Sequence, residues 1–377
     1  MQSIAVFFGG KSPEHDISVI TGVLALNSLC AEQYVAVPVY VTREGKWLTG
    51  KGLNDVSAYK NLDEGRLMEV CSLPNSKTLY VRKNKKLKPL CRPLCVVNAM
   101  HGGGGEDGSM AGLLSLCGIP QTACLPFGAA ATMDKAITKT VLRGAGIRAL
   151  PCVVFTEQGY YRRKTFYVRH AENTLGYPVI VKPASLGSSI GIRRAENEKE
   201  LCAALEQAFR YDQKVVVERA LTGFTEINCA AYRGRKGICV SACERPMTEG
   251  EILSFADKYL ASEKGGSKRE FPAKIPAKTA MLIQTQTRMA YRRLGLRGVV
   301  RVDFLVEENG EVWLNEINTV PGSLAYYLFG DSPSALTTIL DEMIAVAVQD
   351  QQDKESRKTH FESSVLMIDG IKGGKKR

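Results

Sequence analysis

The stretch that most constrains the fold of this chain is residues 301–322, RVDFLVEENGEVWLNEINTVPG. The dipeptide Asn309-Gly310 near its centre is the strongest short-range hairpin signal, because a type I′ turn needs a positive φ at both central residues. Counting outward from that turn places Asp303 opposite Glu316. Two carboxylates that face each other across a strand pair repel, so we expect a divalent cation between them.

The same count places Arg301 opposite Asn318, and the alternation of side chains along a strand then predicts all four residues on one face. Carboxylate and amide oxygens suit Mg²⁺, and Arg301 would stabilise a phosphate or a developing oxyanion. The alternative is a solvated hairpin face whose charges only pair with one another. The opposite face is expected to pack on a core and is largely apolar, with Val302, Phe304, Val306, Trp313 and Ile317.

With 377 residues the chain is too long for one ordinary core, so two or three domains are expected. No apolar run approaches a membrane span, and the first residues lack the basic region of a signal peptide. Eleven scattered cysteines without zinc-site spacing indicate reduced thiols, and hence a cytoplasmic location. The net charge of +11 favours anionic partners. It is concentrated in residues 82–88 and 372–377, without the interleaved aromatic residues that would indicate nucleic-acid binding.

The first 125 residues read as an α/β unit, in which ligands bind beyond the carboxyl ends of the strands. Strands are expected at 4–8, 34–41 and 95–99. Glu14 follows the first strand and either caps the next helix or receives a substrate amine; the local sequence favours the cap. The last strand leads into four consecutive glycines, which either let a ligand approach the backbone or form a plain flexible loop. This loop would present His101, Glu106 and Asp107 at the same edge.

The pattern changes near Pro126, where we place the first domain boundary, and a single helix is predicted over 129–143. Lys182 ends a predicted strand and precedes a Gly/Ser-rich loop that can hold phosphate, although a Walker loop would have its lysine after the glycines. The strands 214–218 and 225–232 offer an apolar edge for a nucleotide base, with Glu226 near the ribose. Residues 254–269 are polar and form either a lid or an ordinary surface loop.

These motifs together resemble those of the ATP-grasp ligases and, within them, the D-alanine–D-alanine ligases. No single motif is decisive, but their order and spacing are highly specific and cover nearly the whole chain. They are FGGKSPE ending at Glu14, HGGGGEDG from His101, MDK ending at Lys135, VKP with GSSIG from Val181, VE ending at Glu218, Lys258-Tyr259, GVVRVD ending at Asp303 and NEINTVPG ending at Gly322.

The resemblance implies an α/β chain, α+β in its grasp domains, with a three-domain ATP-grasp fold. Its domains would be an N-terminal open parallel-sheet domain at 1–125, grasp subdomains at 126–215 and 216–360, and a basic tail at 361–377. The implied enzyme phosphorylates one D-alanine with ATP, and the amine of a second D-alanine attacks the acyl phosphate. The product, D-alanyl-D-alanine, would serve peptidoglycan synthesis. The implied cofactors are ATP and two Mg²⁺, with Mn²⁺ as an alternative, and the implied state is a cytoplasmic homodimer without nucleic-acid or membrane partners.

Residue roles also follow from the resemblance. Catalytic roles fall on Glu14, Ser188, Tyr259, Arg301 and Gly322. Substrate binding falls on Glu14, His101, Ser323 and Leu324. ATP binding falls on Lys135, Lys182, Ser188, Ser189, Glu218, Arg219, Leu221, Glu226, Lys258 and Asn315. Metal binding falls on Asp303, Glu316 and Asn318.

The second substrate stays open at this point. Residues 323–328, SLAYYL, depart from the Ser-x-Ser-type run that many family members carry there, and the lid 261–269 is unusual. D-Serine or D-lactate as second substrate, or another carboxylate–amine ligation, are the alternatives. Lys258-Tyr259 resembles the pair of dipeptide-forming members and favours an amine nucleophile. A catalytically inactive nucleotide sensor is disfavoured, because it would not need Arg301, Asp303, Glu316 and Asn318 in register.

Overall fold

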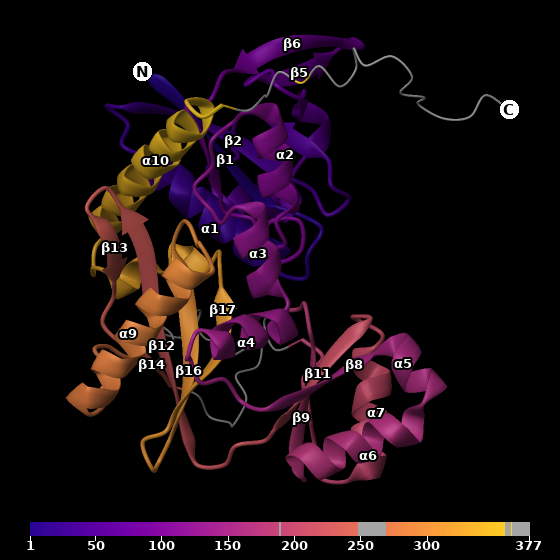
Figure 1. The fold of residues 1–377 in the computed structure, drawn as a ribbon. Coiled ribbons are helices and arrows are strands. Elements are labelled where there is room, and N and C mark those ends of the chain that lie inside the picture. The colour runs from indigo at the N-terminus through magenta and orange to yellow at the C-terminus, as the bar shows by residue number, and fades with distance from the viewer. Residues whose placement is uncertain (188–189, 248–268, 359–362, 364–377) are drawn as a thin grey trace, which may run out of the picture.

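The computed structural model describes residues 1–187, 190–247, 269–358 and 363, and these fold into three units (Figure 1). The first unit holds a seven-stranded sheet in the order β6-β5-β4-β3-β2-β1-β7. Only β2, β1 and β7 are parallel, so the predicted parallel sheet is extended by antiparallel strands. Its elements are β1 (Gln2–Gly9), α1 (His15–Ser28), β2 (Tyr34–Val41), β3 (Trp47–Thr49), β4 (Met68–Ser72), β5 (Leu79–Lys83), β6 (Lys86–Cys91), β7 (Cys95–Asn98) and α2 (Ser109–Cys117).

Two helices lead from this unit to the next, α3 (Pro126–Met133) and α4 (Lys135–Gly144). The single helix expected over 129–143 is therefore wrong. The chain leaves helical geometry at Asp134, whose φ and ψ are −86° and 105°, and the Asp134 carboxylate accepts from the N–H groups of Ala136 and Ile137. A capping carboxylate satisfies N–H groups that the start of a helix leaves without partners, and this favours a new helix beginning at Lys135.

The central unit is a four-stranded antiparallel sheet in the order β10-β9-β11-β8, with α5, α6 and α7 gathered on one side (Figure 1). Its elements are β8 (Cys152–Thr156), α5 (Glu157–Arg162), α6 (Lys164–Leu175), β9 (Val179–Pro183), β10 (Arg193–Ala195), α7 (Glu198–Ala208) and β11 (Lys214–Arg219). The domain boundary expected between residues 215 and 216 falls inside β11, which pairs with both β8 and β9. We therefore propose a boundary after Arg219.

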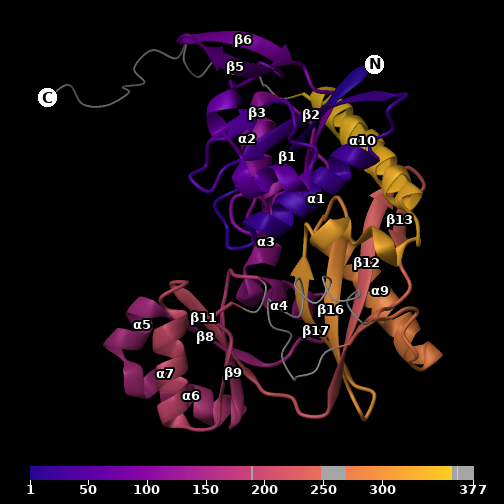
Figure 2. The same cartoon turned by 180° about the vertical axis from the view of Figure 1, so that it is seen from behind.

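The third unit is a four-stranded antiparallel sheet in the order β13-β12-β16-β17, which packs against α9. Its last helix, α10, packs against β12 and also on the core of the first unit, beside α1 (Figure 2). The elements are β12 (Phe224–Gly234), β13 (Gly237–Val240), β14 (Arg245–Pro246), β15 (Arg269–Glu270), α9 (Ala277–Arg293), β16 (Val300–Glu307), β17 (Val312–Asn318), the 3₁₀ segment η4 (Gly322–Leu328) and α10 (Pro333–Glu355). No helix among the described residues has the length and apolarity needed to span a membrane.

The hairpin β16–β17 has the predicted pairs at its far end, with Asp303 opposite Glu316 and Arg301 opposite Asn318. Its turn differs from the predicted type I′. The N–H of Gly310 donates to Glu307, the N–H of Glu307 donates to Glu311, and Gly310 but not Asn309 has a positive φ. The connecting loop is thus residues 308–310, which shifts the pairing by one residue.

A register shift between Asp303 and Phe304 moves the pairing back by one residue. Such a β-bulge sets two residues of one strand against one residue of the other. Asn315 and Glu316 are therefore both directed to the pocket described below. Trp313 lies with Leu305 in a small cluster on the Asp303 side of the sheet, so its predicted place on the opposite face is wrong.

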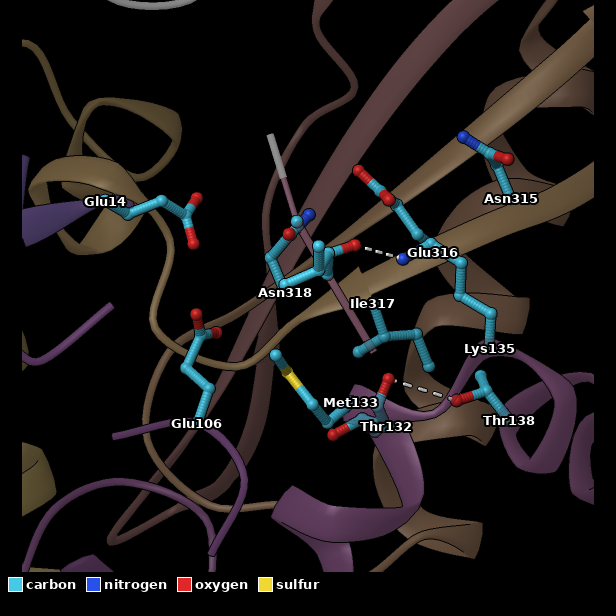
Figure 3. Close-up of a pocket in the computed structure, with 12 residues that line it drawn as sticks. Glu14, Glu106, Thr132, Met133, Lys135, Thr138, Asn315, Glu316, Ile317 and Asn318 are labelled. Carbon is cyan, nitrogen blue, oxygen red and sulfur yellow. Dashed lines mark hydrogen bonds between the residues drawn. The ribbon is translucent and has the colours of Figure 1, made fainter. Parts of the chain in front are cut away.

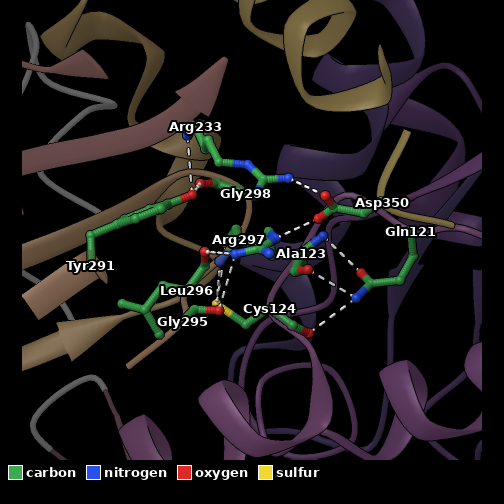
Figure 4. Close-up of polar contacts among 10 residues, drawn as sticks. All are labelled: Gln121, Ala123, Cys124, Arg233, Tyr291, Gly295, Leu296, Arg297, Gly298 and Asp350. Carbon is green, nitrogen blue, oxygen red and sulfur yellow. Dashed lines mark hydrogen bonds and ion pairs between the residues drawn. The ribbon is translucent and has the colours of Figure 1, made fainter. Parts of the chain in front are cut away.

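An ionic network joins α10 to β12 and to the loop that precedes β16 (Figure 4). Asp350 of α10 binds Arg233 of β12 through one carboxylate oxygen. Its other oxygen lies 2.6 Å from Nε of Arg297, in the loop that leads into β16. In the same region the side chain of Gln121 bonds to the backbone of Ala123 and Cys124. The network fixes α10 to the segment that delivers Arg301 and Asp303.

Candidate active site

One pocket lies where the three units meet, between the glycine-rich loop of the first unit, the α3–α4 junction, the loop after β9 and strand β17 (Figure 3). It brings together five residues that the sequence singled out: Glu14, Lys135, Asn315, Glu316 and Asn318. Seven further residues complete its wall: Glu106, Thr132, Met133, Thr138, Leu186, Gly187 and Ile317. In Figure 3 the carboxylates of Glu14 and Glu106 lie on one side, and Lys135 and Glu316 lie on the other.

The acidic side of the pocket begins with Glu14, which precedes α1 and is 8% exposed. Its side chain makes no capping hydrogen bond, so the capping role favoured by the local sequence is wrong. Glu106 faces it, and burial together with the charge of Glu14 raises the pKa of Glu106 to about 7. Two carboxylates that disfavour each other's charge in one pocket are suited to binding an ammonium group.

Glu106 also connects two loops. Its Oε2 accepts from the N–H of Gly102 at 2.8 Å. Its Oε1 accepts from the N–H of Thr319 at 3.0 Å, from the Thr319 hydroxyl at 3.2 Å and from the N–H of Val320 at 2.8 Å. Glu106 therefore fastens the segment that follows Asn318 to the glycine-rich loop of the first unit.

The expected metal site centres on Asp303, which is fully buried. The two oxygens of Asp303 accept from Nε and Nη2 of Arg301 at 2.7 and 2.8 Å, and Oδ2 also accepts from Nδ2 of Asn318 at 3.0 Å. Because a carboxylate oxygen accepts two bonds, Oδ1 keeps one lone pair. Glu316 and Asn318 line the pocket directly. Among the described residues no cluster of three or more His, Cys, Asp or Glu side chains is arranged for a metal, so a fit for Mg²⁺ rests on two carboxylates and an amide oxygen.

The opposite side of the pocket is cationic. Nζ of Lys182 lies 2.8 Å from Glu218 and 3.1 Å from Oδ1 of Asn315. Nζ of Lys139 lies 2.9 Å from the other oxygen of Glu218, and both of these side chains are 1% exposed. Burial alone would raise the pKa of Glu218, but the two lysines outweigh it and lower that pKa to about 2. The carboxylate therefore stays ionised and holds Lys182 beside Asn315.

Lys135 stands at the start of α4, and its Nζ donates to the carbonyl of Leu186 at 2.5 Å. Burial lowers the pKa of Lys135, and the neighbouring Glu316 acts in the opposite direction. This contact ties α4 to the loop after β9, where phosphate binding was expected. Ser188 and Ser189 of that loop lie outside the described residues, as do Lys258 and Tyr259.

Three of the four expected substrate-binding residues, unlike Glu14, do not line the pocket: His101, Ser323 and Leu324. His101 is 2% exposed, and its Nε2 lies 2.9 Å from Oγ1 of Thr21. The N–H of Ser323 donates to the same hydroxyl at 3.1 Å. Leu324 is 4% exposed within the first hydrophobic core, and its N–H donates to Pro321. Gly322 begins η4, directly after Pro321.

The predicted nucleotide edge has an apolar centre. Leu221 is buried in a small cluster with Leu150 and Leu305, against which Phe224 and Trp313 pack. Arg219 is exposed at the end of β11, and Glu226 is half-buried on β12. The carboxylate of Glu218, by contrast, is enclosed by its two lysines. If Glu218 contributes to ATP binding, it does so by holding Lys182.

Three residues with these contacts were missed as site residues. Glu106 was noted in the glycine-rich run but not given a role, and its spacing from Glu14 could not be seen in the sequence. Lys139 lies four residues after Lys135, a spacing that places both on one helix face. Thr21 carries no signal at all in the sequence, because its importance depends on contacts with His101 and Ser323.

Residues 3–124 match the family model of the D-ala D-ala ligase N-terminus, and residues 141–345 match that of the C-terminus. The D-alanine--D-alanine ligase of Thermosipho africanus (strain TCF52B) is 34% identical over 358 residues, covering 95% of this chain and 96% of that protein. The corresponding protein of Chlorobium limicola (strain DSM 245 / NBRC 103803 / 6330) is 36% identical over 358 residues, covering 92% and 96%.

Solved structures agree with these matches. The VanG D-Ala:D-Ser ligase from Enterococcus faecalis superposes with a TM-score of 0.76 at 28% identity, covering 92% of this chain and 99% of that chain. The D-alanine-D-alanine ligase from Coxiella burnetii gives a TM-score of 0.76 at 25% identity, covering 94% and 96%.

Proposed function

The chain belongs to the D-alanine–D-alanine ligase family, and from this premise we propose how its own pocket carries out the reaction. The family uses ATP, and the chain has the family's ATP-grasp fold. The reaction joins two D-alanines into D-alanyl-D-alanine. The observation that carries the proposal is the division of one pocket into an acidic side, Glu14 and Glu106, and a side formed by Lys135 and the Glu316 hairpin (Figure 3).

The ammonium group of the first D-alanine binds Glu14, and Glu106 adds a second carboxylate within the same pocket. The bound cation relieves the repulsion that raises the pKa of Glu106. The substrate carboxylate then points toward Lys135 and the β17 residues. A carboxylate oxygen attacks the γ-phosphorus of ATP, the bond to ADP breaks, and an acyl phosphate forms. This transfer depends mainly on positioning and on neutralising charge.

Lys135 and Lys182 supply positive charge from the side of the central unit, where Lys182 is held by Glu218. Asp303, Glu316 and Asn318 are the residues that would hold two Mg²⁺ ions, with Mn²⁺ as an alternative. When bound, the metal would neutralise the phosphate oxygens and orient them for transfer. Arg301 already neutralises Asp303, so part of the repulsion between the opposed carboxylates is relieved by the protein itself.

In the second step the amine of the second D-alanine attacks the acyl carbon. The tetrahedral oxyanion forms near Arg301 and the N–H of Gly322, phosphate leaves, and the attacking nitrogen loses a proton. Preorganised donors at such a position lower the barrier more than flexible ones do. Arg301 is fixed by two bonds to Asp303, which supports a preorganised role.

The test is phosphate release and product analysis with purified protein, Mg²⁺-ATP and D-alanine. We expect phosphate and D-alanyl-D-alanine in equal amounts, and no product with L-alanine. An equal rate of ADP formation with and without D-alanine would contradict the proposal. Glu14→Gln should reduce turnover by roughly 100-fold or more, because it removes a charged partner of the ammonium group.

D-Serine as second substrate is the second candidate. It is favoured by the similarity to a D-Ala:D-Ser ligase structure and by the segment 323–328. In that segment Tyr327 contacts Arg301, and the guanidinium of Arg269 lies 4.7 Å from its ring centroid. Equal concentrations of D-alanine, D-serine and D-lactate, each competing against a fixed amount of labelled D-alanine, separate the candidates. A cytoplasmic homodimer completes the proposal, and sedimentation of the purified protein checks the dimer.

A further inference from the structure

The segment after Gly322 has an unusual backbone. Ser323, Leu324 and Ala325 have φ angles of 52°, 51° and 44° and ψ angles of 24°, 28° and 27°. Three consecutive residues with side chains in left-handed geometry are costly, because the Cβ atom of each crowds the following carbonyl. Such backbone persists only where its surroundings hold it in place. The question is which groups hold this turn.

One holding group is Thr21, from the middle of α1. Its hydroxyl oxygen accepts from the N–H of Ser323 at 3.1 Å, and it lies 2.9 Å from Nε2 of His101. Thr21 is 1% exposed and His101 is 2% exposed, so no water competes freely for these bonds. The contact joins residues 302 positions apart in the chain. It connects the first unit directly to the first left-handed residue of the turn.

The proton positions follow from this geometry. The Thr21 oxygen accepts from Ser323 and keeps a second lone pair, so the direction of its bond with Nε2 of His101 is set by the ring nitrogen that carries the proton. With the proton on Nδ1 for the hydrogen bond with Val320, Nε2 accepts from the Thr21 O–H. Burial, with a smaller effect of Arg301, lowers the pKa of His101 to about 4, which keeps the ring neutral. A hydrogen bond with the backbone of Val320 acts in the opposite direction, as expected for an Nδ1–H that donates to the Val320 carbonyl.

Thr21 and His101 thus form a chain of hydrogen bonds that contacts residues 320 and 323, on both sides of Gly322. We propose that Thr21 is a positioning residue for the second half of the reaction. It holds the left-handed turn, and through the turn it sets the direction of the Gly322 N–H and the space for the second substrate. This inference rests on the proposed ligation, because it assigns to Thr21 an effect on the second-substrate position of that reaction.

The test compares Thr21→Val, which keeps the shape and loses both bonds, with Thr21→Ser, which keeps the hydroxyl. The matched control is Thr49→Val, since the Thr49 hydroxyl donates a partly buried bond of 2.7 Å to the Pro38 carbonyl in the same unit, away from the pocket. Rates are measured against D-alanine concentration, with one Michaelis constant for each substrate position, and separately against ATP. Wild-type dipeptide formation is measured first, so failure of the ligase function is recognised independently of Thr21.

For Thr21→Val we expect kcat/KM for the second substrate to fall roughly 10- to 100-fold, because a small displacement of positioned groups has effects of that size. The Michaelis constant for ATP should stay within about threefold, and Thr21→Ser should restore most of the loss. Equal losses for ATP and the second substrate, no recovery with Thr21→Ser, or an equal loss in Thr49→Val would each overturn the proposal.

A second measurement keeps the proposal testable if Thr21→Val does not fold. Glycine tolerates the left-handed region, so Ser323→Gly lowers the conformational cost of the turn that Thr21 holds in place. In that background Thr21→Val and wild-type Thr21 are compared again. We expect Thr21→Val to lower the second-substrate kcat/KM less in this background than in the protein with Ser323. If Thr21→Val alone does not fold, the loss is measured in this background only. A positioning role would be contradicted if Thr21→Val left kcat/KM unchanged in the Ser323→Gly background. It would also be contradicted by a full loss of ATP binding.

Discussion

The molecule contains two carboxylates that are each held between two cations, in opposite surroundings. Glu218 lies between Lys139 and Lys182, and these three side chains are 1%, 1% and 10% exposed. Asp350 lies between Arg233 and Arg297, and those side chains are 31%, 28% and 25% exposed. The charges and the arrangement are alike. The residue types differ, Lys and Glu in one cluster and Arg and Asp in the other, and so do the access of water and the neighbouring structures.

The comparison teaches that burial, and not the number of ion pairs, decides what such a cluster does. In both cases burial alone would raise the pKa of the carboxyl group, and the cations lower it. Both carboxylates are therefore ionised at neutral pH. Water compensates for a lost partner around Asp350, whereas the residues around Glu218 cannot do so. The Glu218 cluster also continues through Lys182 to Asn315 in the pocket.

The largest effect is expected from Glu218→Gln. The change leaves Lys139 and Lys182 buried without their anion, and breaking a buried ion pair typically lowers the free energy of unfolding by about 3–5 kcal/mol. Urea unfolding at pH 7 measures it. Asp350→Asn serves as the matched control, since it removes the same charge from the partly exposed cluster. Equal losses for the two variants would show that burial is not the deciding difference.

The next effect separates the two lysines. Lys182→Met should raise the Michaelis constant for ATP by roughly 10- to 100-fold, because it removes a charge-assisted contact of about 1.5–3 kcal/mol at the pocket. Lys139→Met removes the same charge from Glu218, but Nζ of Lys182 contacts the pocket residue Asn315, whereas the ion pair of Lys139 is with Glu218. We therefore expect a loss of stability with a much smaller change in that constant. Initial rates against ATP concentration measure both. A larger change for Lys139→Met would assign the nucleotide contact to the wrong lysine.

The sequence predicted the positions of site residues better where strand pairing places them than where loops place them. Asp303 and Glu316 were correctly placed opposite each other, but by a count that assumed a two-residue turn. The actual loop shifts the register by one residue, and a bulge at Asp303 shifts it back. Neither irregularity has a clear local signal. The two cancel at the site but not at Trp313, which is why that residue was placed on the wrong face.

The remaining differences have the same physical origin. Local sequence favoured Glu14 as a helix cap, because an acidic residue at a helix start is usually stabilised there. Its side chain instead enters a pocket made by chain segments far away in the sequence, including Asn318. Thr21 and Glu106 likewise act through contacts with residues about 200 to 300 positions away. Local pattern contains no information on such contacts until the three units are placed together.

The third prediction contrasts Glu218 with Glu106, whose carboxyl pKa shifts in the opposite direction. The usual pKa of 4.5 is raised to about 7 in Glu106, so between these values the unfolded chain binds fewer protons than the folded chain. Its contribution to the free energy of unfolding is therefore present below pH 4.5 and is lost as the pH rises through 7. For Glu218, lowered to about 2, the contribution is present above pH 4.5 and is lost as the pH falls toward 2.

Urea unfolding of wild type and Glu106→Gln at several pH values between 4.5 and 7.5 checks this contrast. The free energy of the wild type relative to the variant should fall across the range, since the glutamine does not titrate. Taking the difference removes the contribution of His101, whose lowered pKa acts in the opposite direction over an overlapping range. A difference that is constant or rises with pH would contradict the raised pKa of Glu106.

The smallest effect is expected at the partly exposed Asp350 cluster. Asp350→Asn removes the anion shared by Arg233 and Arg297, but both guanidinium groups can regain water, so the free energy of unfolding should fall by no more than about 1 kcal/mol. The effect should shrink further in high salt, which screens exposed charges and leaves buried pairs largely unaffected. Because Arg297 lies in the loop that leads into β16, the variant also tests whether this network helps to place Arg301. If the cluster only joins α10 to its neighbours, kcat stays within about twofold of wild type while stability changes slightly. A large loss of kcat with little loss of stability would instead make the partly exposed cluster part of the catalytic geometry, and the contrast with Glu218 would no longer hold.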